Sequence, residues 1–359
     1  MAAVYGANAS GKSNLLDGLE FMADAVRDSF MRWQPFSGVP RSPFKLDLAA
    51  ADRVSVFVAE FVEHGVRYTY GFEVNDDRVL AEWLYSYPEK RKRVLFDRTD
   101  DHVRFGRSIA VGTEKLDVLE RFLRPNALFL SLAAQFNTPD VMPVYRWFTR
   151  KLRFRLNDDH RDVAARVVAF LADHGPHAER LVELLHAADV GISELRLDGP
   201  DDLRLVHGDR GVLRLEEESA GTRSWLGLLP EVLRVLVEGG VLVIDEIDAS
   251  LHSLLSARLV ALFNDPESNR GYGQLVFTTH DATLLHPPLA DEVLDRDEVW
   301  FVEKDREGAS RLYPLSDFKP RREDNLERRY LAGQYGAVPH VYEEHFKTAV
   351  RDGVFSGQA

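Results

Sequence analysis

The stretch that decides the fold is Gly6-Ala7-Asn8-Ala9-Ser10-Gly11-Lys12-Ser13, near the start of the chain. It fits the pattern G-x-x-x-x-G-K-[ST] of a phosphate-binding loop without exception. Its small residues let successive backbone N–H groups curl around a phosphate, and the N-terminus of the following helix adds positive potential. The stretch lies between a short apolar run, 2–5, and a predicted amphipathic helix over 13–30, which is the context that this loop requires.

A second apolar run, 241–244, predicts a buried strand that is followed directly by Asp245 and Glu246. Ligands of open α/β folds bind at the carboxyl ends of the parallel strands, so we expect this acidic pair beside the phosphate loop. There Asp245 and the hydroxyl of Ser13 are predicted to hold Mg²⁺. Lys12 is predicted to reach the β- and γ-phosphates, and Glu246 to polarise the attacking water. Without the phosphate loop, an apolar strand with an acidic end would be equally compatible with a purely structural role.

The rest of the chain predicts an α/β fold. Apolar strands alternate with helices, which favours a mainly parallel sheet covered on both faces. The expected strands of this kind are 241–244, 275–278 and 299–302, and the expected helices are 219–237 and 250–263. Further strands are expected at 127–132, 192–197, 203–206 and 212–215, and a helical stretch at 157–188. In contrast, the runs 54–62, 66–74 and 79–87 are separated by short turns and predict an antiparallel β-subdomain over about 54–105.

The composition is that of a globular protein. The 359 residues include 45 basic and 58 acidic side chains, and the net charge of −13 argues against a surface built all round to bind nucleic acid. The sequence contains no cysteine, which excludes disulfides, thiolate zinc sites and a cysteine nucleophile. No apolar run is long enough to span a membrane and the first residues lack an apolar targeting core, so a cytoplasmic location is predicted.

Two further features narrow the class of nucleotide-binding protein. Ser219-Ala220-Gly221-Thr222 opens a predicted helix, where Ser219 can cap the N-terminus and Gly221 leaves it open for an anion. His280 follows the apolar strand 275–278 at the sheet edge that also receives Asp245. A capping serine without a ligand, and a structural histidine at a strand end, are the alternatives for each feature taken alone.

The ordered set of these motifs, with Asp248 after the acidic pair, resembles ABC-type ATPases. More narrowly it is similar to the branch shared by SMC, RecF and OLD proteins and the AAA-named phage-defence ATPases, in which Asn8 of the loop is typical. The stretches 313–319 and 330–339 resemble the RloA/AbiLii group of abortive-infection ATPases. The resemblance implies a P-loop ABC-type ATPase head with a mainly parallel sheet, an antiparallel β-subdomain and a short helical insertion.

The resemblance also implies a role for each matching residue. Ser219 and Gly221 match the signature loop, which contacts the γ-phosphate held by a second protomer, so a homodimer through an ATP sandwich is expected. Asp248 matches the D-loop, His280 the histidine that senses that phosphate, and Gln135 is the candidate Q-loop glutamine, although an ordinary polar residue at a strand end is as good a reading. The expected catalytic residues are Glu246, His280 and Lys12, and the expected metal ligands are Ser13, Asp245 and Gln135. The expected ATP-binding residues are Gly6, Asn8, Ala9, Ser10, Gly11, Lys12, Ser13, Asn14, Ser219, Gly221, Asp248 and Gln135.

The predicted organisation has four parts. Residues 1–135 form the lobe with the phosphate loop and the β-subdomain, and 136–190 form a helical insertion too short for an SMC-type coiled coil. Residues 191–318 form the lobe with the signature loop, the acidic strand and His280, and 319–359 form a C-terminal segment. Proteins of this branch begin with some tens of residues of β-structure, so we expect the chain to be N-terminally incomplete, with an open sheet edge and an unassigned adenine pocket.

Two basic stretches leave nucleic-acid binding open. Residues 90–93 read Lys-Arg-Lys-Arg, and 145–155 mix aromatic side chains with five basic ones. Such a mixture suits phosphate contacts with base stacking, whereas an amphipathic lid with a solvated basic face is the favoured alternative.

The function predicted from the sequence is Mg²⁺-dependent ATP binding and hydrolysis by a head dimer that controls a partner effector in phage defence. The partner is expected to be encoded nearby and to be RloB-like, because the sequence shows no second chemistry. The alternatives are an ATP-gated DNA-binding clamp or repair ATPase like RecF, and a nucleotide-binding scaffold with little hydrolysis. A transporter subunit and a small-molecule kinase are disfavoured.

Overall fold

A six-stranded sheet carries the phosphate loop in the computed structural model, which describes 1–339 except 48–52, 108, 110–111, 157–162, 174, 189, 200–201, 287–292 and 322, together with 344, 347 and 348. The strand order is β14-β13-β1-β12-β11-β7. The five parallel strands are β1 (Ala2–Gly6), β7 (Leu152–Arg155), β11 (Val241–Ile244), β12 (Gln274–Thr279) and β13 (Val299–Lys304). The edge strand β14 (Ser310–Pro314) is antiparallel to β13. The prediction of a mainly parallel sheet in an α/β fold is therefore confirmed.

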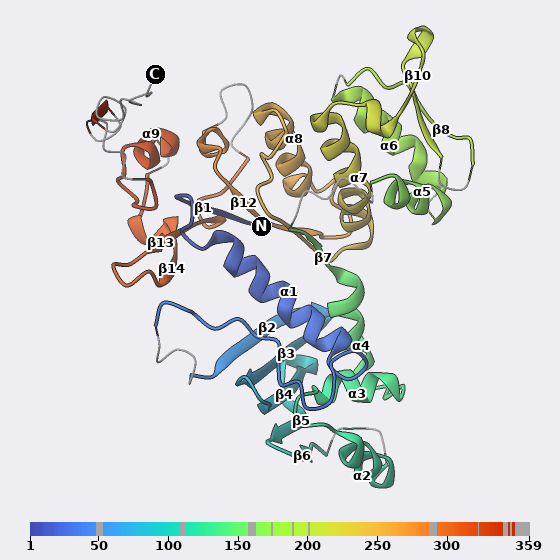
Figure 1. The fold of residues 1–359 in the computed structure, drawn as a ribbon, viewed down its shortest axis with the longest axis vertical. Helices are drawn as coiled ribbons and strands as arrows, with labels where there is room; N and C mark the ends of the chain where they lie inside the picture. The colour runs from blue at the N-terminus through green and yellow to red at the C-terminus, as the bar shows by residue number, and fades with distance from the viewer. Residues whose placement is uncertain are drawn as a thin grey trace, which may run out of the picture.

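Helices cover both faces of this sheet (Figure 1). In the view of Figure 1, α1 (Lys12–Asp28) lies below it, and α7 (Ala220–Glu238) and α8 (Ser253–Asn264) lie above it. A smaller layer beside α7 contains α5 (Val163–Asp173), α6 (Gly175–Ala187) and the antiparallel strands β8 (Glu194–Leu197), β9 (Leu203–Val206) and β10 (Val212–Arg214). At the other end, α9 (Leu326–Leu331) lies near β13 and β14. In the described part of the chain, no helix combines the length and apolarity needed to cross a membrane.

The antiparallel subdomain is a five-stranded meander below α1. Its strands pair in chain order: β2 (Ser55–Glu63), β3 (Val66–Val74), β4 (Val79–Tyr87), β5 (Arg93–Thr99) and β6 (His102–Phe105). Buried side chains of α1, among them Leu16 and Met22, share one hydrophobic cluster with Tyr70 and Phe72 of β3. The helix that follows the phosphate loop is thus held between the two sheets, and the predicted antiparallel subdomain is confirmed.

A fully buried ion pair joins the meander to the helices beneath it. The carboxylate of Glu82 on β4 lies 3.6 Å from the guanidinium of Arg98 on β5, and both side chains are completely buried. Glu82 accepts hydrogen bonds from the backbone N–H groups of Phe129 (2.6 Å) and Leu130 (2.9 Å). Burial raises the pKa of the Glu82 carboxyl, and the charge of Arg98 counteracts that rise. The pair therefore fixes the start of the segment at Phe129 against the sheet.

The strand expected at 127–132 is wrong, because this segment forms the helix α3 (Phe129–Gln135). A short, uniformly apolar run does not distinguish a buried strand from a buried helix. Here the Glu82 carboxylate satisfies the first free N–H groups of the helix, which favours the helical state. The segment lies in the helical layer of the subdomain with α2 (Thr113–Phe122) and α4 (Met142–Arg146).

The basic stretch 145–155 is not a lid. It forms the end of α4, a π-helical turn (Trp147–Lys151) and the strand β7, which pairs with β11 in the main sheet. Two of its aromatic side chains pack on the β-subdomain: Trp147, which is partly buried, stacks on Phe61 with 4.0 Å between ring centroids, and Phe148 is buried. The ring of Phe148 and the stacked face of Trp147 are consequently not available to stack on bases. Since β7 falls inside 136–190, that range is not wholly helical, and the predicted domain limits themselves stay a prediction.

The expected open edge beside the phosphate-loop strand is also absent. Strand β1 has a parallel neighbour on each side, with Ala3 paired to Phe277 of β12 and to Val299 of β13. The strands that flank β1 therefore come from the second half of the chain.

Replacing Glu82 by Ala is expected to lower the free energy of unfolding by about 3–5 kcal/mol, because it leaves the buried guanidinium of Arg98 without its ion-pair partner. Chemical denaturation measures the loss. The matched control is Arg104→Ala, which removes a largely exposed pair with Asp97 and should cost less than about 1 kcal/mol. Equal effects of the two substitutions would show that the buried pair does not hold the subdomain together.

Candidate nucleotide-binding site

The phosphate loop lies where the sequence predicts it, between β1 and α1. Gly11 has a φ of 101°, a conformation that favours glycine, and a side chain at this position would collide with Ser310 of β14. The hydroxyl of Ser310 donates a 2.7 Å hydrogen bond to the backbone carbonyl of Ser10. The hydroxyl of Ser10 itself is buried without a hydrogen-bond partner among the described residues. Ser310 of β14 thus stabilises the loop by a hydrogen bond, and the loop contains one buried hydroxyl, that of Ser10, which has no described partner.

Lys12 points back into its own loop. Its ammonium group donates hydrogen bonds to the backbone carbonyls of Gly6 (3.0 Å) and Ala7 (3.3 Å) and lies 3.2 Å from Nε2 of His280. Burial lowers the pKa of the Lys12 ammonium, and the carboxylates of Glu246 and Asp245 counteract that effect. The cation therefore occupies the interior of the loop, where a bound phosphate would replace the carbonyl oxygens as its partner.

Two of the three predicted metal ligands, Ser13 at the start of α1 and Asp245 directly after β11, are in direct contact. The hydroxyl of Ser13 donates a 2.8 Å hydrogen bond to Oδ2 of Asp245. The hydroxyl of Thr278 donates to Oδ1 of Asp245 (2.5 Å) and accepts from the backbone N–H of Glu246 (2.7 Å). Sequence reasoning did not single out Thr278. Its signal in the sequence is its position at the polar end of an apolar strand, two residues ahead of His280.

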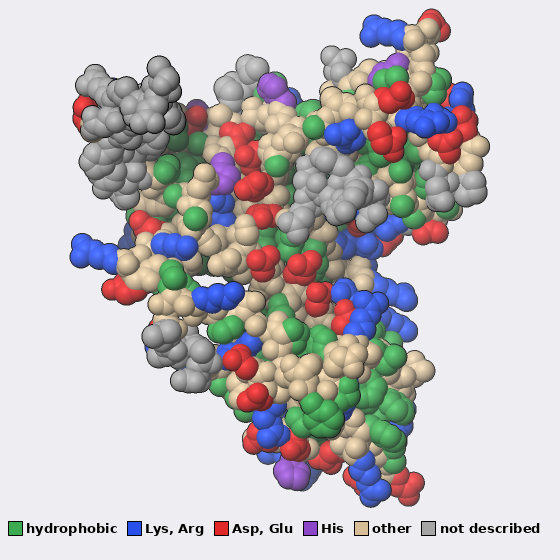
Figure 2. Space-filling view, viewed as in Figure 1, with side chains coloured by type: hydrophobic (Ala, Val, Ile, Leu, Met, Phe, Trp, Pro, Cys, Tyr) green, Lys and Arg blue, Asp and Glu red, His purple; other side chains and the backbone are tan. Residues whose placement is uncertain are grey.

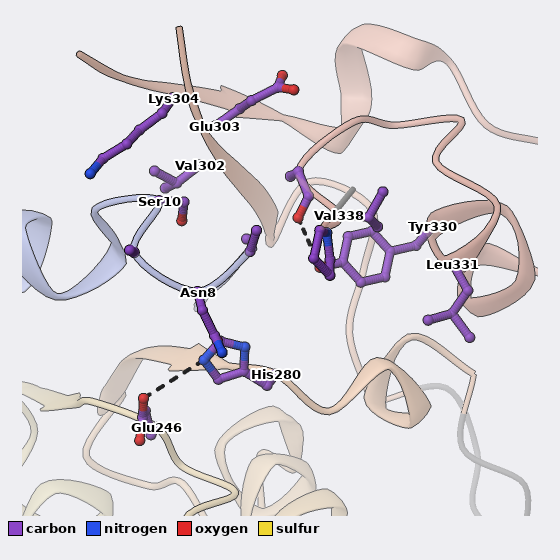
Figure 3. Close-up of a pocket in the computed structure, with 15 residues that line it drawn as sticks. Asn8, Ser10, Glu246, His280, Val302, Glu303, Lys304, Tyr330, Leu331 and Val338 are labelled. Carbon is purple, nitrogen blue, oxygen red and sulfur yellow. Dashed lines mark hydrogen bonds and ion pairs between the residues drawn. The ribbon is translucent and has the colours of Figure 1, made fainter. Parts of the chain in front are cut away.

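Glu246 and His280 face each other across the edge of the sheet, with 3.7 Å between a carboxylate oxygen and Nε2 (Figure 3). Glu246 has a φ of 52°, an uncommon conformation for a residue with a side chain, which turns the chain at the end of β11. Asp248 accepts hydrogen bonds from the hydroxyl of Thr279 (2.6 Å) and the backbone N–H of His280 (3.2 Å). Asp248 thereby holds the turn that presents His280.

Two cavities open around these residues. One of about 470 Å³ is lined by loop residues from Asn8 to Asn14 and by Glu246, His280 and Lys304. The other, of about 880 Å³, begins at Gly6–Ser10 of the loop and extends to the C-terminal residues Tyr330, Leu331 and Ala337–Pro339 (Figure 3). Sequence reasoning did not assign this C-terminal wall or Lys304 to the site.

The surroundings of the loop are rich in acidic side chains. Figure 2 shows Asp and Glu side chains across the part of the face that carries β1 and β12. Within the described ranges, three or more His, Asp or Glu side chains do not gather as a metal centre of their own. Mg²⁺ typically takes only one or two protein ligands and completes its shell with water and phosphate oxygens, so Ser13 and Asp245 fit it.

Ser219 and Gly221 do not reach this site from within the same chain. Ser219 caps α7, and its hydroxyl accepts a 3.1 Å hydrogen bond from the backbone N–H of Thr222. A side chain at Gly221 would lie 2.9 Å from the backbone carbonyl of Ser250, in the turn that follows Asp248. Neither residue is among the described lining of the two cavities.

Gln135 is wrong as a metal or nucleotide ligand in this structure. It ends α3, where its side chain donates a 3.3 Å hydrogen bond to the hydroxyl of Tyr145. The start of that segment packs on the C-terminal end of α1, with the N–H of Leu128 bonded to the hydroxyl of Ser29. Since α1 has 17 residues, about 25 Å of helix separates this end from Lys12. The strand beside β11 is instead β7, whose Arg155 accepts a backbone hydrogen bond from Asp245 (2.9 Å).

The comparison with protein families identifies the class. Residues 1–286 match the family model described as "AAA domain, putative AbiEii toxin, Type IV TA system". The chain belongs to this AAA-domain family. A search of curated proteins gave no match to the AAA-domain protein. A similar solved structure is that of the Smc head bound to the C-winged helix domain of ScpA, with 16% identity, 89% of this chain and 92% of that chain covered, and a TM-score of 0.48.

Proposed function

We propose that this AAA-domain protein binds Mg²⁺-ATP at the phosphate loop and hydrolyses it with Glu246 as the general base. The observation that carries the proposal is the hydrogen bond between Ser13 and Asp245, which joins two stretches 232 residues apart. Each stretch by itself has the pattern of a phosphate or metal site, and their contact is what a Mg²⁺-nucleotide site requires. The family match supports the same class of activity.

Each side chain of the site has a role that follows from its position. Lys12 and the loop N–H groups bind the phosphates, and Lys12 exchanges its bonds to loop carbonyls for bonds to phosphate oxygens. Ser13 and Asp245 would hold Mg²⁺, which neutralises phosphate charge beside so many carboxylates. Glu246 takes the proton of the attacking water, and His280, held by Asp248, is placed to contact the phosphate that is released.

Exchanging Glu246 for Gln is expected to retain ATP binding and to slow turnover by at least about 100-fold, because an amide is not a base. Lys12→Ala is expected to abolish binding, because it removes the cation inside the loop. Equilibrium binding and phosphate release measure the two steps separately. Glu267→Gln, on an exposed turn after α8, is the matched control and should behave as wild type. Wild-type turnover by the Glu246→Gln protein would refute the assigned base.

The position of Ser219 and Gly221 outside the two cavities further supports a head dimer. The N-terminus of α7 presents Ser219 and Gly221 away from the cavities of their own chain, and a free helix N-terminus attracts an anion. Two copies that face each other would bring the α7 N-terminus of one to the phosphate loop of the other. ATP then becomes part of the interface, and its hydrolysis separates the heads.

The Glu246→Gln protein is expected to change from monomer to dimer when Mg²⁺-ATP is added, since bound ATP is then not consumed. Light scattering measures the mass. Ser219→Arg in the same background should prevent the change, whereas Glu267→Arg, on the exposed turn after α8, is the control. A Glu246→Gln protein that binds ATP and stays monomeric would contradict the sandwich.

We propose a partner protein because the described residues show no second catalytic site. Within them, apart from the Ser13–Asp245 site, no cluster of His, Asp or Glu forms a metal centre that could supply a second chemistry. We propose a cytoplasmic effector, RloB-like and encoded nearby, whose activity depends on opening and closing of the heads in phage defence. Since Phe148 is buried and one face of Trp147 is stacked on Phe61, these two rings do not support base stacking by that basic stretch.

Co-expression with the adjacent gene is expected to give a stable complex and to reduce plaque counts, whereas Lys12→Ala should restore plaquing. Pull-down and plaque assays on a broad phage panel measure both effects. Unchanged plaquing combined with tight ATP-dependent DNA binding by this protein alone would instead establish the repair alternative.

A further inference from the structure

The larger cavity has two walls of different chemistry. On one side lie the loop residues Gly6–Ser10, with Glu246 and His280 below them (Figure 3). On the opposite side Val338 and the ring of Tyr330 face the loop across the cavity, and Leu331 and Pro339 continue the apolar surface. A nucleoside triphosphate has a matching division, with a charged phosphate end and a base whose aromatic faces can pack on an apolar surface.

The C-terminal wall is anchored on the strand that precedes the phosphate loop. The ring of Tyr330 contacts the ring of Tyr5 edge-on, with 5.5 Å between centroids, and stacks on Phe301 of β13 at 5.5 Å. Tyr335 also stacks on Phe301, at 5.6 Å. Since Tyr5 directly precedes Gly6, the wall and the loop share one packed cluster. The position of the wall relative to the phosphates is therefore set by core packing.

Hydrogen bonds and tight turns fix the shape of the wall. The hydroxyl of Tyr313 on β14 donates to the backbone carbonyl of Tyr335 (2.9 Å), and that of Tyr330 donates to the carbonyl of Ala337 (3.3 Å). Gly336 has a φ of 68°, and a side chain there would lie 2.7 Å from the hydroxyl of Tyr313. The turn consequently requires glycine and presents Val338 to the cavity.

We propose that the base of the bound nucleotide packs against this C-terminal wall, formed by Tyr330, Leu331, Val338 and Pro339. The inference rests on the proposed function, because it assumes that the phosphates bind at Lys12. It assigns base recognition to residues beyond 286, where the family match ends. Lys304, at the end of β13, lines both cavities.

The test compares two probes that differ only in the nucleoside: Mg²⁺-ATP and inorganic Mg²⁺-tripolyphosphate. Binding is measured by calorimetry in the full chain carrying Glu246→Gln, so that ATP is not consumed. Val338→Trp fills the cavity, and Leu331→Gln makes the wall polar without adding charge. Each is expected to weaken ATP binding about tenfold or more and to leave tripolyphosphate binding within about twofold of the parent.

The matched control is Leu197→Gln, an exposed leucine on β8, which should change neither affinity. Circular dichroism reports whether each variant is folded, and only folded variants are compared. Parent protein that binds both probes equally, or wall variants that bind ATP normally, would overturn the inference while leaving the proposed function intact. Wall variants that lose both probes would show that the segment only supports the loop. A parent that binds neither probe would refute the proposed function and this inference with it.

Discussion

The parallel pairing of β1 with β12 is the interaction on which the site depends. Because these strands run in the same direction, the phosphate loop after β1 and His280 after β12 emerge at the same edge of the sheet. β11, parallel to β12 on its other side, adds Asp245 and Glu246 at that edge. Thr278 then connects the strands chemically, since its hydroxyl bonds both to the Asp245 carboxylate and to the Glu246 backbone.

The helix α1 transmits that arrangement to the second sheet. Its first residue, Lys12, lies inside the phosphate loop, and its apolar face is buried against the antiparallel meander. A change in the loop on nucleotide binding therefore acts on a helix that both sheets contact. The buried pair of Glu82 and Arg98 gives the meander a rigid connection to α3, so the subdomain can follow α1 as one body.

The C-terminal part of the chain completes the architecture from the other side of β1. Strand β13 fills the position next to β1, β14 supplies Ser310 to brace the loop, and the aromatic cluster around Phe301 positions the segment beyond α9. An ATPase site built in this way depends on both ends of the chain.

Much of this protein could be read from local patterns. The loop 6–13, the acidic end of β11 and the position of His280 were predictable because each is a short stretch whose chemistry depends on its own spacing. The meander was predictable for its first three strands, because alternation and tight turns are local signals. The predictions for 127–132 and 145–155 failed, because uniformly apolar runs and mixed basic and aromatic runs do not reveal which surface they pack against.

By itself, then, the sequence determined the phosphate-loop motif and the acidic and histidine residues that the fold brings beside it. Only the tertiary structure decided which strands lie next to β1 and that Gln135 is far from the loop. It also decided that Thr278 joins the acidic strand to its neighbour and that the C-terminal segment lines the cavity. The physical reason is that these are contacts between segments far apart in the chain. Such contacts are selected by burial and hydrogen bonding in the complete core, and a local sequence pattern does not indicate which distant segment it will contact.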